Sequence, residues 1–263
     1  MKRTFTLLIL MVVILAPSFG QENYKVIKVN GEIVLKEKGT PLQTGTEFSK
    51  NDNLVFRTED ATAAVINSQK GRLILTSRNH DLAAAGSNYM PAMYNIASRG
   101  GMILSLSDLS KLFEGKYVIL ERQNLVLNPS IFPMNSNSFF FLRYNYKNEE
   151  INKKLDYSGD TLIIDRSRLY TVDGKPIPGP DNTTISLYYR KGSESSLVNR
   201  FELIFPDESQ LRKEVSIIMN EFSKKTEKEL FNEIGAYITD NYGKVSPENL
   251  KAWIQSNFGA KTK

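Results

Sequence analysis

Glycine-containing turns divide most of this 263-residue chain into short apolar runs. Such turns occur at four well-separated places: Asn30-Gly31, Lys70-Gly71, Asp173-Gly174 and Lys191-Gly192. Glycine and asparagine adopt the positive φ angles that tight turns between strands require. Apolar runs separated by turns about every 8–12 residues are typical of sandwiches and barrels. The pattern therefore predicts a mostly β chain as far as residue 205.

The positions of these runs predict two β domains and a segment between them. Residues 21–76 contain five short apolar runs and predict a small β barrel or sandwich. Residues 116–205 contain about seven and predict a second, β-sandwich-like domain. Residues 77–115 are less regular. They predict a connecting segment with one short helix, which Ser107 would cap and Gly115 would end.

The last part of the chain, residues 206–263, changes to helical spacing. Apolar residues recur every three or four positions, as expected for about three amphipathic helices. Ser246-Pro247-Glu248 predicts the start of the last helix, because serine caps it and proline fits its first turn. The fold class is therefore mostly β with a C-terminal α segment. The apolar stripe of the last helix is either core or a partner-docking surface of the helix-in-groove kind, and consists of Leu250, Trp253, Ile254 and Phe258.

The N-terminus has the pattern of a secretory signal. Lys2 and Arg3 precede an apolar run that ends at Pro17, and Ser18 and Gly20 are small residues at the cleavage positions. A membrane-spanning helix needs about 20 apolar residues, and this run is shorter. We therefore predict a signal peptide over residues 1–20 and no membrane span after its cleavage. The periplasm is the expected location, with the extracellular space and the outer-membrane surface as alternatives.

Cysteine content and charge argue against a fold held together by disulfides and against a nucleic-acid-binding protein. The chain has no cysteine, so an exported form must be held together by core burial and not by disulfides. Its net charge is +5, of which the signal peptide carries two charges, and both signs are mixed along the sequence. This weak and dispersed charge argues against nucleic acid as a partner.

Residues 24–76 also carry a resemblance to a known family. An ordered series of turn motifs carries it: Asn30-Gly31-Glu32-Ile33, Leu42-Gln43-Thr44-Gly45, Asn51-Asp52-Asn53-Leu54, Ala61 to Val65 and Lys70-Gly71-Arg72-Leu73. Together these motifs resemble the small β domain of FecR-type envelope proteins. Those regulators also carry a cytoplasmic segment and a membrane span before this domain, and the chain lacks both. The resemblance therefore implies a fold and a cellular setting, and does not imply transmembrane signalling.

A second, shorter resemblance points to a similar setting. Asp160-Thr161-Leu162 looks like the O-glycosylation motif of exported Bacteroidetes proteins. The rest of the chain resembles no family that we recognise.

No catalytic, cofactor or metal motif is readable in the sequence. His80 is the only histidine, and Asp81 beside it is badly placed to orient it in a catalytic triad. Zinc prefers several histidine or cysteine ligands, and no calcium-loop or phosphate-loop motif occurs. We therefore predict no catalytic residues, no cofactor and no metal.

Four aspartates in the second β region are the remaining catalytic candidates: Asp156, Asp160, Asp165 and Asp173. A glycosidase needs only two carboxylates at a suitable separation. All four stand beside turn residues, however, where aspartate commonly bonds its own backbone. A carboxylate-dependent glycan or peptidoglycan hydrolase is therefore an alternative and not the first hypothesis.

Aromatic residues are concentrated between positions 139 and 146. Phe139, Phe141, Tyr144 and Tyr146 would form an aromatic platform for a glycan or peptide if they shared an exposed face. Equally, aromatic residues supply the core of a sandwich.

The first functional hypothesis is a non-catalytic binding or scaffold component of a bacterial cell-envelope assembly, with an envelope protein as partner and a glycan as a further candidate. The alternatives are the hydrolase and a periplasmic ligand-sensing module.

Overall fold

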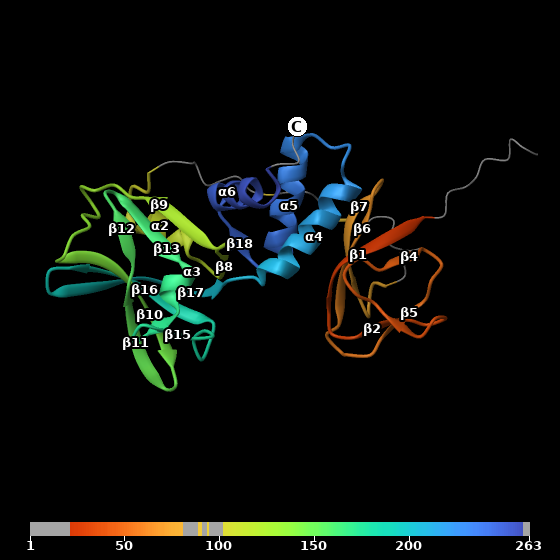
Figure 1. Ribbon diagram of the computed structural model, residues 1–263, viewed down its shortest axis with the longest axis horizontal. Coiled ribbons are helices and arrows are strands. Elements are labelled where there is room, and N and C mark those ends of the chain that lie inside the picture. The colour runs from red at the N-terminus through yellow and green to blue at the C-terminus, as the bar shows by residue number, and fades with distance from the viewer. Residues whose placement is uncertain (1–21, 81–88, 91–93, 95–101, 260–263) are drawn as a thin grey trace, which may run out of the picture. The chain divides into compact units, whose positions relative to one another are not determined.

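The computed structural model describes residues 22–80, 89–90, 94 and 102–259 (Figure 1). Their fold is mostly β and ends in three long helices, so the predicted fold class is confirmed. None of the sheets that these residues form closes into a barrel. The chain divides after Met90 into two compact units. The predicted signal peptide lies outside the described residues.

The first unit contains two antiparallel sheets. One has the strand order β4-β1-β6-β7 and the other the order β3-β2-β5. A core that includes Tyr24, Ile33 and Leu75 draws residues from both sheets. The strands are β1 (Asn23–Asn30), β2 (Ile33–Leu35), β3 (Thr40–Pro41), β4 (Glu47–Ser49), β5 (Leu54–Phe56), β6 (Thr62–Asn67) and β7 (Gly71–Thr76).

The Asn30-Gly31 turn has a different role from the hairpin that its sequence predicts. Gly31 does adopt a positive φ of 74°. The strands on its two sides do not pair with each other, however, because β1 pairs with β4 and β6 while β2 pairs with β3 and β5. The turn therefore carries the chain from one sheet to the other. A Cβ at Gly31 would lie 3.0 Å from Ala61, which adds a steric reason for glycine.

The second unit is built on a six-stranded sheet of order β11-β10-β16-β17-β8-β18. A three-stranded sheet, β12-β13-β9, and the short hairpin β14-β15 complete its strands. The strands are β8 (Lys116–Val118), β9 (Arg122–Val126), β10 (Ser138–Tyr146), β11 (Glu149–Lys154), β12 (Asp156–Ser158), β13 (Thr161–Asp165), β14 (Thr171–Val172), β15 (Lys175–Pro176), β16 (Thr184–Lys191), β17 (Glu194–Ile204) and β18 (Lys244–Val245).

Two hairpins of this unit form where the glycine turns predict them. Asp173 and Gly174 join β14 to β15 with φ angles of 50° and 73°. Lys191 pairs with Glu194 across the turn that contains Gly192, so this turn joins β16 to β17. Positive φ at a two-residue loop matches the twist of the flanking strands. In both cases the local sequence determines the turn.

The described residues form five helices, two of them short. They are α2 (Leu106–Leu112), α3 (Arg166–Leu169), α4 (Glu208–Glu221), α5 (Glu227–Asn241) and α6 (Pro247–Phe258). Ser246 caps α6 as predicted, and its side chain accepts a hydrogen bond from the N–H of Asn249. The predicted cap of α2 is wrong by two residues, because Ser105 and not Ser107 accepts from the N–H of Asp108.

The C-terminal helices belong to the same compact unit as the second β region. Strand β18, between α5 and α6, runs parallel to β8 at the end of the six-stranded sheet. Tyr94 adds a further connection, since its hydroxyl donates a hydrogen bond to the carbonyl of Val245 (2.8 Å). Its ring lies against Gly235 of α5, where a Cβ would come within 2.5 Å of it.

The apolar stripe of α6 is mostly core. Leu250, Trp253 and Phe258 are buried, and Ile254 is partly buried. Of the two interpretations of this stripe, the burial of these three side chains favours core packing over an exposed docking surface.

Candidate ligand-binding pocket

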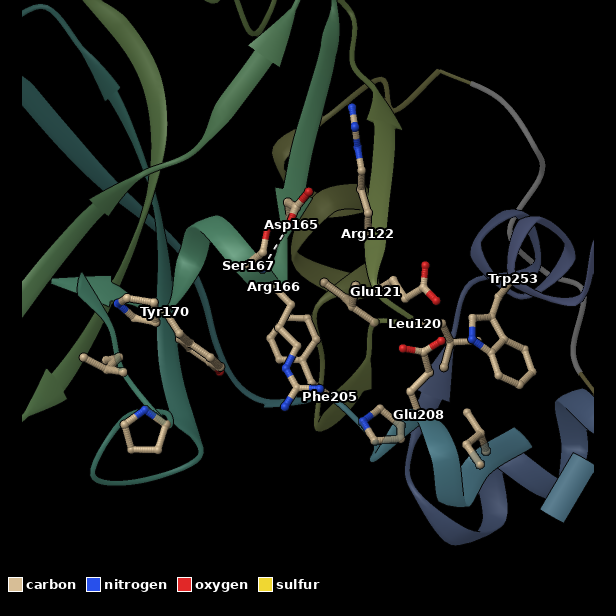
Figure 2. A pocket seen from close by; sticks show the side chains of 16 residues that line it. Leu120, Glu121, Arg122, Asp165, Arg166, Ser167, Tyr170, Phe205, Glu208 and Trp253 are labelled. Carbon is tan, nitrogen blue, oxygen red and sulfur yellow. Dashed lines mark hydrogen bonds between the residues drawn. The ribbon is translucent and has the colours of Figure 1, made fainter. Parts of the chain in front are cut away.

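The second unit contains a pocket of about 700 Å³ between its β strands and its C-terminal helices (Figure 2). Five parts of the chain form its wall: the segment that leads into β9, the helix α3 with its flanking residues, the proline-rich segment Pro176–Pro178, the start of α4 with the residues before it, and α6. Its apolar side chains include two aromatic rings and the indole of α6. The apolar lining is Ile119, Leu120, Tyr170, Pro176, Ile177, Pro178, Phe205, Pro206, Leu211 and Trp253.

Two glutamates face each other at this pocket. Glu121 precedes β9, and Glu208 is the first residue of α4, directly after the N-cap Asp207 (Figure 2). The carboxyl of Glu208 raises the pKa of Glu121 above its ordinary value, first by a hydrogen bond between the two groups, then through desolvation and charge repulsion. A neighbouring carboxyl group disfavours the charged form of Glu121.

Cationic and amide groups from the helices partly offset the rise in the pKa of Glu121. Arg212 donates hydrogen bonds to Glu208 Oε1 (2.9 Å) and to Asn257 Oδ1 (3.2 Å). The charge of Arg212 and a hydrogen bond with Asn257 both lower the pKa of Glu121, although the effect of Glu208 is larger. The pair is therefore fixed by contacts from α4 and α6.

The backbone beneath Glu121 has an uncommon conformation that α6 holds in place. Glu121 has a φ of 62°, which side-chain-bearing residues rarely adopt. The amide side chain of Asn249 accepts from the N–H of Leu120 (2.8 Å) and donates to the carbonyls of Leu120 (3.1 Å) and Arg122 (2.8 Å). These three hydrogen bonds flank Glu121 on both sides, so Asn249 supports the backbone conformation at Glu121.

The opposite wall of the pocket is formed by α3 and its neighbours. Asp165 caps this helix, accepting hydrogen bonds from the N–H (2.9 Å) and the hydroxyl (2.6 Å) of Ser167 (Figure 2). The guanidinium of Arg166 lies 5.6 Å from the centre of the Phe205 ring. Tyr170 meets the same ring edge to face, with 5.4 Å between the ring centres. Burial raises the pKa of Tyr170 to about 12, so its hydroxyl is neutral.

The four aspartates that are catalytic candidates in the sequence have structural roles. Asp165 is a helix cap, and Asp173 is in a hairpin turn. Asp156 forms an ion pair with Arg168 at 2.9 Å. Asp160 lies in the turn between β12 and β13, where the hydroxyl of Thr161 donates to it over 3.3 Å. Only Asp165 of the four lines the pocket described above.

Strand β10 separates the predicted aromatic platform into two groups. Tyr144 is 3% exposed and Tyr146 packs against the core of the second unit, so both belong to its inner face. Phe139 and Phe141 point to the opposite face, because side chains alternate along a strand. The sequence places these residues close together, but the period of the strand prevents four of them from sharing one surface.

Sequence reasoning missed the pair of glutamates. No motif surrounds Glu121, and Glu208 looks like an ordinary acidic residue in the first turn of a helix. The two are far apart in the chain, so only the tertiary fold brings them together.

Comparison with known proteins does not assign the chain to a family. No protein-family model, no curated protein and no solved structure matches the chain. The resemblance of residues 24–76 to the FecR-type domain therefore stays a prediction. No helix of the described residues has both the length and the apolar character needed to cross a membrane. Within the same residues, no cluster of three or more histidine, aspartate or glutamate side chains is arranged to hold a metal ion.

Proposed function

We propose that this chain is an exported, non-catalytic binding component of a bacterial cell-envelope assembly, and that its pocket receives the ligand or partner segment. The observation that carries the proposal is the pocket itself, whose wall combines apolar and aromatic side chains with five charged ones. Concave sites of about 300–1,000 Å³ with this mixture of groups are the usual form of ligand sites. The signal-like N-terminus supports export, with the periplasm as the expected location.

The proposal is tested by capture from native envelopes with a blocked pocket. Ser167→Phe places an aromatic ring at the pocket wall and keeps the backbone N–H that Asp165 accepts. Ser158→Phe, at the exposed end of β12 and outside the pocket, is the matched control. We expect mild crosslinking and affinity capture to yield a stoichiometric partner with the wild type and the control. Loss of that partner only with Ser167→Phe would support the proposal, whereas equal capture by all three chains would refute it.

One observation favours the hydrolase as a second candidate. Glu121 and Glu208 both line the pocket, and the pKa of Glu121 is raised by the neighbouring carboxyl of Glu208; catalysis by an acid and a base uses two carboxyl groups with different pKa values. A hydrolase should release fragments from isolated peptidoglycan or envelope polysaccharide, measured by mass spectrometry. Glu121→Gln and Glu208→Gln should then each slow release by about 100-fold or more. The binding proposal predicts no release by the wild type.

A further inference from the structure

The outer face of the six-stranded sheet carries a cluster of aromatic and cationic side chains. Strands β11, β10 and β16 lie side by side (Figure 1). Phe141 stands opposite Lys154 of β11 and Tyr188 of β16, and Phe139 stands opposite Arg190. We call this surface the aromatic–cationic face and define it as Phe139, Phe141, Arg143, Lys154, Tyr188 and Arg190.

The aromatic rings of this face form a continuous row. Phe141 and Tyr188 are stacked, with 5.1 Å between their centres and 6° between their planes. The ring of Phe139 follows at 6.4 Å from Phe141. Phe139 and Tyr188 are only partly buried, whereas Phe141 is buried, with 7% of its surface exposed. Because the rings are anchored on adjacent strands, the row is rigid and needs little ordering when a ligand binds.

Two cations converge on one end of the row. The ammonium of Lys154 lies 4.3 Å from the centre of the Phe139 ring, and the guanidinium of Arg190 lies 5.8 Å from the same centre. Arg190 uses its Nε for a hydrogen bond to the carbonyl of Gly192 (2.9 Å). Neither cation makes an ion pair with an acidic side chain of the described residues.

The other end of the row is different. Arg143, which covers the Tyr188 ring at 4.7 Å, forms an ion pair with Glu150 at 3.2 Å. Positive charge without a counterion is therefore concentrated around Phe139. Two like charges held near one ring repel each other, and a bound anion would relieve that repulsion.

We propose that the aromatic–cationic face binds an acidic polysaccharide. Its carboxylate would lie between Lys154 and Arg190, and the apolar faces of its sugar rings would contact Phe139 and Tyr188, the two partly exposed rings of the row. An acidic peptide fits less well. A peptide would pair with the free edge of β11, but that strand carries Glu149 and Glu150 as well as Lys153 and Lys154 and so has no net positive charge to attract acidic side chains. The functional groups also lie on the face of the sheet and not along its edge.

The test uses the full mature chain and soluble polymers at low salt. Polygalacturonate is the acidic probe, dextran the neutral probe and polyglutamate the acidic peptide probe, with affinities measured by calorimetry. The double variant Lys154→Gln, Arg190→Gln removes the two converging cations. Lys175→Gln, Lys224→Gln removes the same charge from exposed positions elsewhere and is the control. Phe139→Ser removes the ring between the cations.

We expect polygalacturonate to bind the wild type and the control equally, and dextran not to bind. The cation variant should weaken polygalacturonate binding by about tenfold or more, because it removes charge-assisted contacts. Phe139→Ser should also weaken it. No binding of polygalacturonate, or equal binding by the cation variant and its control, would overturn the proposal. So would polyglutamate binding as tight as that of polygalacturonate and unchanged by Phe139→Ser, since that result shows a site for any polyanion.

Discussion

Asn249 is the residue that connects the last helix to the pocket. It is buried, and its side chain forms three hydrogen bonds with the backbone on both sides of Glu121. A second buried contact lies beside it, where Gln123 donates to the N-cap hydroxyl of Ser246 (2.9 Å). Buried polar groups that lose their partners cost more than the hydrogen bond itself contributes. The stability of the pocket therefore depends on single amide side chains.

Asn249→Ala should destabilise the second unit by about 1–3 kcal/mol, because it leaves the buried N–H of Leu120 without its acceptor and removes a donor from the carbonyls of Leu120 and Arg122. Urea unfolding measures this free energy. Asn241→Ala is the control, since that side chain bonds only the carbonyl of Tyr237 within its own helix. The control should cost less than about 1 kcal/mol. Similar losses in the two variants would show that Asn249 does not hold the backbone of residues 120–122.

Gly235→Ala should destabilise the chain, although the same substitution usually stabilises a helix. In an ordinary helix it would add roughly 1 kcal/mol of stability. Here the new Cβ would lie 2.5 Å from the Tyr94 ring, so we expect a loss of about 1–3 kcal/mol. In a Tyr94→Ala background the overlap is gone, and Gly235→Ala should no longer destabilise. Thermal unfolding of the two single variants and the double variant measures this coupling. A stabilising Gly235→Ala in the wild-type chain would contradict the packing.

Glu121→Gln should raise stability at neutral pH. The pKa of Glu121 is higher in the folded chain than its ordinary value of 4.5, so its favourable contribution exists at acid pH and is lost as the pH rises through the raised pKa. The melting temperature of the variant should therefore exceed that of the wild type near pH 7. The difference should shrink as the pH falls toward 4.5.

Glu194→Gln, at an exposed position at the start of β17, is the control for this pH series. It should show no such trend. A gap between Glu121→Gln and the wild type that stays constant from neutral to acid pH would mean that Glu208 does not act on Glu121.

At the scale of elements, α6 is the helix on which both the core and the pocket depend. Trp253 is 3% exposed, contributes to the pocket wall and meets the Phe258 ring at 5.7 Å. Trp253→Ala should cost about 3–5 kcal/mol, as expected for a large buried ring. Gln255→Ala, on the exposed side of the same helix, should change the free energy of unfolding by no more than about 0.5 kcal/mol. Denaturant unfolding compares them, and equal stabilities would mean that α6 projects from the core.

The sequence predicts elements well where their cause is local. Ser246-Pro247 starts α6 because capping needs only neighbouring residues, and Asp173-Gly174 forms its hairpin because the turn needs only positive φ. Asn30-Gly31 has the same local conformation, but its hairpin is not formed because pairing with β4 and β6 determines where β1 lies. The short helix α3 was not predicted at all.

The candidate pocket is less predictable than the strands because its groups come from distant parts of the chain. Glu121 and Glu208 meet only after β8, β18 and α4 have packed, and no spacing in the sequence records that contact. The aromatic cluster shows the same limit. Its composition is evident in the sequence, but only the alternation along β10 shows which rings face outward.

At the scale of the whole molecule, the chain consists of two compact units with separate cores. Leu75→Ala in the core of the first unit should cost that unit about 2–5 kcal/mol. Because its contacts belong to the first core, we expect calorimetry to show one transition moved to lower temperature and the other unchanged. An equal shift of both transitions would show that the units unfold together.

The most direct test of the binding proposal is site-specific photo-crosslinking in the native envelope. A photoreactive residue replaces Ser167 at the pocket wall in one chain and Ser158 outside the pocket in another. We expect a single discrete adduct from position 167 and none from position 158, and mass spectrometry would identify the bound molecule. Adducts of equal yield from both positions, or no adduct from position 167, would contradict the proposal that the pocket is the binding site.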